Sequence, residues 1–198
     1  MSATPPLTIA NQRADAAANR RVILDAGARL IAEHGISTTL NDVARDAGVG
    51  IATVYRNFPN REALLDALFA VKLSELVSLA EISAAISDPA QAFDSYQFAV
   101  MKLHATDRGV VPALMRANHS AAFSEELARQ LGPRVQPLIH AAQAAGTLRE
   151  AFTIQDLCLL SAMVGSVADL TRDSEPALWE RYARMLIDGT RPPLEPSA

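Results

Sequence analysis

The sequence predicts an all-α fold, and three observations support that prediction. Of the 198 residues, 49% are hydrophobic, and Ala and Leu dominate over the β-branched residues, which favours helices. Apolar residues recur at helical spacing between start and stop signals along most of the chain. No strand pattern, internal repeat or sustained heptad accompanies them.

The chain is expected to begin with an arm and a long helix. Residues 1–19 are rich in Ala, Pro, Asn and Thr and lack periodicity, which predicts a flexible arm. From Arg20 to His34, apolar residues recur at helical spacing and predict the first helix. Gly35 follows as the left-handed residue that commonly ends a helix.

Three more helices are expected in quick succession. Thr39 is placed to cap a two-turn helix, and Asp42, three residues later, can reach back to the cap before Gly48 ends the helix. A third short helix is expected over residues 50–58, and Asn60 caps a fourth. Two helices joined by a glycine turn of a few residues form a helix-turn-helix pattern.

The third helix has a polar side whose purpose needs explaining. Val49, Val54 and Phe58 are spaced to face the centre of a three-helix unit. A helix of this width fits the major groove of DNA, where hydroxyl and Arg side chains bind phosphates and fix the register. The alternative is a small surface helix with an incidental Tyr and Arg. The outward or edge positions are Gly50, Ile51, Thr53, Tyr55, Arg56 and Asn57.

Three motifs follow one another in this region: TLNDVARDAGV from Thr39 to Val49, TVYRNF from Thr53 to Phe58, and PNREAL from Pro59 to Leu64. Through these motifs, residues 20–69 resemble the DNA-binding domain of the TetR family of transcription regulators. The resemblance implies a helix-turn-helix DNA-binding domain over residues 20–66. It also implies a variable helical domain over residues 67–190 that binds a small-molecule inducer and forms a homodimer, followed by a tail at 191–198.

The resemblance also implies roles for individual residues on double-stranded DNA. The sequence departs from the commoner family pattern at Gly50, where Ser or Thr often caps the helix, at Asn57, where His is frequent, and at Arg61, which replaces Lys. Arg56 is the best candidate for contacting a guanine in a palindromic operator, with a phosphate contact as the alternative. Positions matching phosphate contacts are Thr39, Thr53, Tyr55 and Arg61, and those matching base contacts are Ile51, Ala52 and Arg56.

Charge is distributed unevenly along the chain. The formal net charge is −4, yet the first 61 residues hold seven Lys or Arg against five Asp or Glu. This mild asymmetry is compatible either with a DNA-binding first third or with chance scatter of surface charge. Arg13, Arg20 and Arg21 either place an arm in the minor groove or are simply solvated.

The second half is expected to be a helical region with its own helix start and stop signals. Asp88-Pro89 opens a helix, and a further helix is expected from about Val110 to Asn118. Gly132-Pro133 is expected to break or kink the helical segment after Ser124. The later signals are Gly146 as a helix end, Thr153 with Asp156 as a capping box, and a last helix from about Pro176 to Asp188.

A ligand pocket and a dimer interface are expected in this second region. Small residues in Ser161-Ala162-x-x-Gly165-Ser166 and Ala141-Ala142-x-x-Ala145-Gly146 suit close helix approach, either between two subunits or within one. The pocket prediction singles out no subset, because Met and aromatic residues at helical spacing also serve as ordinary core. Its candidates are Tyr96, Met101, His104, Met115, Arg116, Asn118, His119 and Phe123.

Other functional classes find little support in the sequence. No Gly-rich phosphate loop, nucleophile elbow or spaced His/carboxylate pair indicates an enzyme, and we expect no cofactor and no metal. A redox switch at Cys158, the single cysteine, is a further alternative, although its apolar neighbours favour an inert buried thiol. Without a signal-peptide pattern or a long enough apolar run, we expect a cytoplasmic protein. The family resemblance makes a repressor that a small-molecule inducer releases from its operator the leading expectation.

Overall fold

The computed structural model describes residues 9–34, 37–106 and 121–193, and within these ranges the chain consists of helices and turns without strands. This confirms the all-α prediction. The chain divides within its fourth helix into two compact units, residues 1–69 and 70–198. We call them the N-terminal and the C-terminal unit and describe each by itself.

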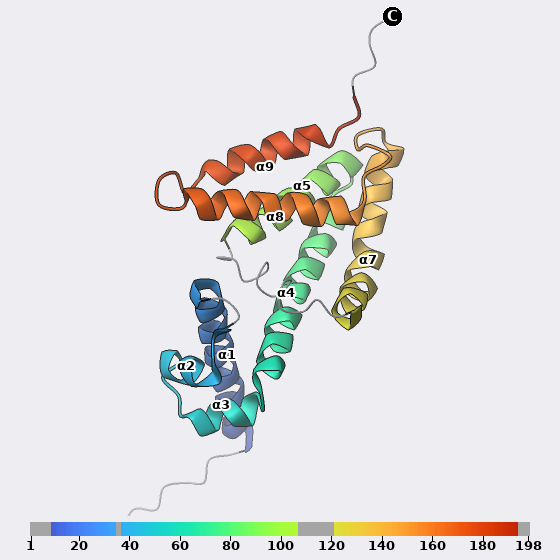
Figure 1. Ribbon diagram of the computed structural model, residues 1–198. Helices are drawn as coiled ribbons and strands as arrows, with labels where there is room; N and C mark the ends of the chain where they lie inside the picture. The colour runs from blue at the N-terminus through green and yellow to red at the C-terminus, as the bar shows by residue number, and fades with distance from the viewer. Residues whose placement is uncertain (1–8, 35–36, 107–120, 194–198) are drawn as a thin grey trace, which may run out of the picture. The chain divides into compact units, whose positions relative to one another are not determined.

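The N-terminal unit holds three helices and the start of a fourth (Figure 1). Thr39 caps α2, its side chain accepts a hydrogen bond from the Asp42 N–H, and Asp42 bonds back to the cap, so the predicted capping box is confirmed. Gly48 ends the turn at φ 65°, and the Asn60 side chain accepts a 2.8 Å bond from the Ala63 N–H at the start of α4. The helices are α1 (Ile9–His34), α2 (Leu40–Asp46), α3 (Ile51–Asn57) and α4 (Arg61–Ala84).

The first helix is longer than the sequence indicated. Helix α1 begins at Ile9, so the prediction of a flexible arm over residues 1–19 is wrong from residue 9 onward. The segment from Ala14 to Ala18 contains four alanines, and alanine has the highest helix propensity. A helix nucleated on the buried residues after Arg20 therefore extends backward at little cost.

The core of the N-terminal unit joins all four helices. Ile23 and Ala26 of α1, Val43 of α2 and Val54 of α3 are fully buried. Helix α1 approaches α4 closely at Gly27, where an added Cβ would lie 3.3 Å from a methyl carbon of Leu64. The two-turn helices α2 and α3 are too short to be stable alone, so this shared core fixes them in place.

The C-terminal unit is built around α5 (Pro89–Thr106), and α8 (Ile154–Thr171) and α9 (Leu178–Gly189) pack against it (Figure 1). Asp88 caps α5 through a 2.9 Å bond to the Gln91 N–H, and Thr153 and Asp156 form the second predicted capping box. By length and composition α8 alone among the described helices could cross a membrane. In this unit it instead packs on α5 and α9.

Helix α7 (Ala121–Ala144) corrects another prediction. The sequence predicts that Gly132-Pro133 breaks or kinks the segment, and the break is wrong because the helix continues through Pro133 and Pro137. Its buried face, which includes Leu131 and Val135, spans the prolines and offsets the lost backbone bonds. Gly146 ends this region at φ 69°, as predicted. The helix expected at 110–118 lies outside the described residues.

Candidate DNA interface and ligand site

Helix α3 has one buried side and one exposed side. Val54 and Phe58 are at most 1% exposed, and Val49 is half-buried. Tyr55 is 51% exposed and Ile51 38% exposed, although both are large apolar or aromatic side chains. A surface that displays such residues without covering them is suited to binding another molecule. Gly50, Ala52 and Arg56 are also exposed, whereas Thr53 and Asn57 are half-buried.

The polar side chains of α3 are held by bonds within the helix. Arg56 donates from Nη2 to Thr53 Oγ1 at 3.0 Å, so its guanidinium lies along the outward face with its other N–H groups available. Asn57 donates to the Thr53 carbonyl at 2.9 Å. The Asn57 amide therefore stabilises the end of α3 and is less available for DNA than the predicted contact assumed.

The ends of neighbouring helices place two further candidate residues. Thr39 is exposed, and its hydroxyl is engaged in the capping box, where hydrogen bonds from Thr39 lower the pKa of Asp42. Arg61 is half-buried, and its Nε donates to the Thr38 carbonyl at 3.3 Å. Gly50 precedes α3 without a side-chain cap, a loss of only a few tenths of a kcal/mol.

Arg20 has a role that sequence reasoning missed. Its guanidinium carbon lies 4.4 Å from the centroid of the Phe58 ring, and Nη1 donates to the Asn57 carbonyl at 3.2 Å. Arg20 is therefore neither simply solvated nor a groove-binding arm in this structure, because it ties α1 to the end of α3. The contact joins residues 37 apart, so no local pattern could reveal it. Arg21 is exposed, and the side chain of Arg13 lies outside the described part.

The predicted ligand residues divide into three groups. Tyr96, Met101 and His104 are buried on α5, and Met101 belongs to an apolar cluster with Val164 and Trp179. Met101 is therefore core. The structure does not describe Met115, Arg116, Asn118 and His119, nor the side chain of Phe123.

Several buried polar atoms of α5 have no hydrogen-bond partner. They are Tyr96 Oη, His104 Nδ1 and both amide atoms of Gln97, a residue the sequence analysis did not select. Gln97 could have been found by spacing, since it lies four residues before Met101 and seven before His104 on one helical face. Burial lowers the pKa of His104 to about 4 and raises the pKa of Tyr96. Both side chains are therefore neutral at pH 7.

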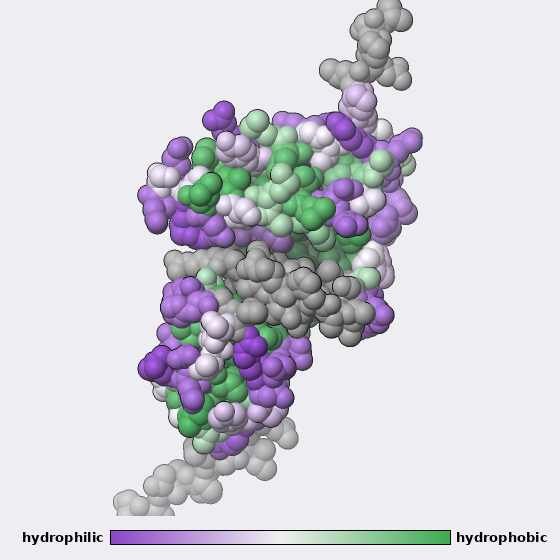
Figure 2. Space-filling view, viewed as in Figure 1, coloured by the Kyte–Doolittle hydropathy of each residue, from purple (hydrophilic) through white to green (hydrophobic). Residues whose placement is uncertain are grey.

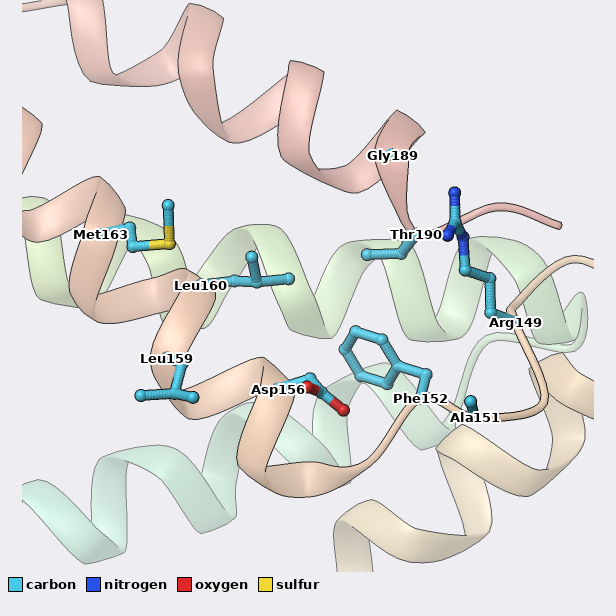
Figure 3. A pocket seen from close by; sticks show the side chains of 9 residues that line it. All are labelled: Arg149, Ala151, Phe152, Asp156, Leu159, Leu160, Met163, Gly189 and Thr190. Atoms are coloured by element: carbon cyan, nitrogen blue, oxygen red, sulfur yellow. The ribbon is translucent and has the colours of Figure 1, made fainter. Parts of the chain in front are cut away.

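An open groove of about 450 Å³ lies elsewhere in the C-terminal unit (Figure 3). It lies between the start of α8 and the end of α9 and shares no residue with the predicted pocket. Phe152 and Leu160 form part of its apolar wall, while Arg149 and Asp156 supply polar groups. Its other lining residues are Ala151, Leu159, Met163, Gly189 and Thr190.

Helices α8 and α9 carry several exposed apolar side chains. Apolar residues gather over these helices on the face shown in Figure 2. We define the α8–α9 face as the exposed side chains Leu159, Met163, Leu170, Tyr182 and Met185. Ser161 and Gly165 point inward instead, and a Cβ at Gly165 would lie 3.2 Å from the His104 carbonyl oxygen. These two small residues therefore allow close packing of helices within one subunit. Of the two interpretations of the small-residue pattern, the contact within one subunit applies to them.

The structure gives little support to a redox switch or to a metal site. Burial raises the pKa of the Cys158 thiol, so little reactive thiolate is present at neutral pH, which opposes a redox switch. Among the described residues, no three His, Cys, Asp or Glu side chains are grouped so as to hold a metal ion.

A three-helix unit whose third helix displays Tyr55 and Arg56 has the architecture of helix-turn-helix DNA-binding proteins. Residues 23–68 match the family model described as "Bacterial regulatory proteins, tetR family", and residues 88–192 match "Transcriptional regulator SbtR-like, C-terminal domain". The chain therefore belongs to the TetR family of transcription regulators, which confirms the resemblance seen in its sequence.

Individual relatives agree with this assignment. The chain is 49% identical over 49 residues to the HTH-type transcriptional repressor LfrR of Mycolicibacterium smegmatis, 25% of each protein. It is 39% identical over 64 residues to the uncharacterized regulator YvkB of Bacillus subtilis, 32% of this chain and 33% of that one. The matches thus span a quarter to a third of these curated relatives. The crystal structure of the TetR regulator SCO0520 from Streptomyces coelicolor superposes with a TM-score of 0.61 at 28% identity, covering 88% of this chain and 99% of that one.

Proposed function

We propose that this protein is a cytoplasmic homodimeric repressor that binds a palindromic operator and is released by a small-molecule inducer. The observation that carries the proposal is the exposed face of α3, where Tyr55 and Arg56 stand over a fully buried Val54. A helix anchored on one side and displaying polar groups on the other can enter the major groove without rearranging.

Each outward residue has a specific role in this proposal. Arg56 contacts a guanine edge, and exposed Ile51 and Ala52 offer apolar contact to thymine methyl groups. Thr39, Thr53, Tyr55 and Arg61 contact phosphates, while Gly50 lets the backbone approach and Asn57 holds the end of the helix. The bond from the Arg56 guanidinium to the Thr53 hydroxyl has an uncharged acceptor, which a guanine edge or an anionic phosphate can replace.

A mobility-shift assay with the DNA upstream of the protein's own gene tests this function. Wild type should bind that DNA specifically and lose affinity steeply with added salt. Arg56→Ala should lose about 10-fold or more in affinity for that site, whereas Tyr55→Phe should lose less because it removes one phosphate bond. If wild type bound the upstream DNA no better than random sequence at any salt concentration, the proposed autoregulated operator would be wrong.

We assign the dimer contact to the α8–α9 face. Leu159, Met163 and Leu170 are spaced four and seven residues apart, so they form one outward stripe on α8. Leu170 is 86% exposed and Met163 55% exposed, which is costly unless another surface covers them. The open groove continues this stripe, since Leu159 and Met163 also line it. A two-fold symmetric pair carries two α3 helices, which matches the two half-sites of a palindromic operator.

The oligomeric state tests the assignment of this face. Met163→Glu should convert the dimer to monomer in sedimentation at micromolar concentration, because it places a charge in the apolar contact. Ile82→Glu on α4 is the matched control, since Ile82 is also a highly exposed apolar residue but lies outside the α8–α9 face. Dimers that persist in Met163→Glu, or that dissociate in Ile82→Glu, would contradict it.

A further inference from the structure

Helix α5 carries buried polar atoms that nothing in the described part of the protein satisfies. Gln97 is 0% exposed, and neither its amide nitrogen nor its amide oxygen has a hydrogen-bond partner. Tyr96 Oη and His104 Nδ1 are also unpaired. Because most buried polar atoms in proteins are paired, three unpaired residues within three turns of one helix need an explanation.

These residues lie at the packing of α5 against α8. Gln97, Met101 and His104 share one face of α5 by their spacing, and the backbone of His104 lies against Gly165 of α8. Met101 joins the apolar cluster that includes Trp179 of α9. The unpaired atoms therefore belong to the interior of the C-terminal unit, next to apolar side chains.

The titratable side chains named here are neutral. Burial lowers the pKa of His104 to about 4 and raises the pKa of Tyr96 and of Cys158 on α8, so all three are neutral at pH 7. A charged ligand group placed beside them would lose its hydration without gaining a counter-ion from these three side chains. A neutral group would lose far less.

We propose that Gln97, flanked by Tyr96 and His104, binds the polar group of an uncharged small molecule that carries both a donor and an acceptor, such as a carboxamide or lactam. The Gln97 amide offers two donors and one acceptor oxygen, so a carboxamide can bond to both of its ends at once. The apolar part of the molecule packs beside Met101 between α5 and α8. This inference rests on the proposed function, because it names the class of inducer.

Three eight-carbon probes with different end groups test whether the site prefers an uncharged molecule: octanamide, octanoate and octylamine. Binding is followed by melting temperature and by the fluorescence of Trp179, the single tryptophan, which lies in the Met101 cluster. Octanamide should bind at least 10-fold more tightly than either charged probe. Absence of octanamide binding up to its solubility limit, or equal binding of a charged probe, would overturn the proposal.

The variant Gln97→Met separates a ligand site from a merely structural position. It should weaken octanamide binding about 10-fold or more, and it should raise the melting temperature of the ligand-free protein by about 2 °C or more, because an unpaired buried amide is removed. Gln91→Met is the matched control, since Gln91 is an exposed residue on the same helix and should change neither quantity. A lower melting temperature for Gln97→Met would show that ordered water satisfies the amide, and would overturn the proposal.

These readouts use free protein, so they fail or succeed independently of DNA binding. If octanamide binds through Gln97 but leaves operator affinity unchanged, the site stands and the proposed release mechanism fails. If the protein binds no operator at all, the regulator function fails and the ligand site is still decided by the two variants.

Discussion

The N-terminal and C-terminal units differ in how their polar side chains are paired. In the N-terminal unit, Thr39 and Asp42 satisfy each other, Asn60 caps α4, and Arg20 is held on Phe58. In the C-terminal unit, polar atoms inside α5 are left unpaired, and the α8–α9 face remains apolar and exposed.

This difference has a physical meaning. A DNA-reading helix gains affinity when its shape is fixed before binding, since no ordering cost is then paid on the operator. Unpaired polar atoms and an uncovered apolar face cost stability in the free chain, and both costs are recovered when a ligand or a second subunit binds. The N-terminal unit is thus satisfied by its own contacts, whereas our proposals assign a ligand and a second subunit to the open groups of the C-terminal unit.

The largest expected effect is the loss of the N-terminal core. Phe58→Ala should cost about 3–5 kcal/mol, because it removes a fully buried ring on which Arg20 also stacks. Operator binding should disappear, while Trp179 fluorescence in the C-terminal unit should still report native packing. Tyr55→Ala, at an exposed position of the same helix, is the control and should barely change stability. Simultaneous loss of the Trp179 signal in Phe58→Ala would show that the units do not fold separately.

A somewhat smaller effect concerns the unpaired groups of the C-terminal unit. His104 has a folded pKa of about 4, below the usual value of 6.5, so between these pH values the unfolded chain binds a proton that the folded chain does not. Stability should therefore rise with pH from about 4 to 6.5 and then level off, by about 3 kcal/mol at most.

Urea unfolding at a series of pH values, followed by Trp179 fluorescence, measures this dependence. His104→Gln should flatten the rise in this pH window, whereas His140→Gln, at an exposed position of α7, should leave it intact. A wild-type stability that does not change between pH 4.5 and 6.5 would mean that His104 is protonated or paired in the folded protein.

The smallest effect compares the same capping device in the two units. Thr39→Ala and Thr153→Ala should each cost about 1 kcal/mol, since each removes one side of a capping box. Thr39→Ala should also weaken operator binding, because Thr39 is proposed to contact a phosphate, whereas Thr153→Ala should leave operator affinity unchanged. Thermal unfolding and mobility shift on both variants measure this. Equal operator affinities for the two variants would contradict the proposed phosphate contact of Thr39.

Local signals predicted much of this structure. Helix caps depend only on residues a few positions apart, so the sequence alone reveals them. The examples are Thr39 with Asp42, Thr153 with Asp156, and Gly146. The inward positions of Val54 and Phe58 follow from helical spacing alone. These signals define the starts of α2 and α8, the end of the α7 region and the orientation of α3.

Other features depend on distant parts of the chain. The contact of Arg20 with Phe58, and the burial of Gln97, are decided by which helices pack together. Helix α7 continues through Pro133 because its buried face outweighs the local breaking signal. Small residues at Ser161 and Gly165 fit either an internal or an external contact, and only the position of α5 decides between them.

A genome-wide selection of DNA fragments bound by wild type and by Arg56→Ala decides whether α3 determines operator choice. The proposed function predicts that wild type enriches one palindromic sequence with half-sites about 34 Å apart. Arg56→Ala should then lose preference at one symmetric pair of guanines while keeping the rest of the sequence. Enrichment of the same sequence with the same guanine preference by both proteins, or no enrichment by wild type, would contradict it.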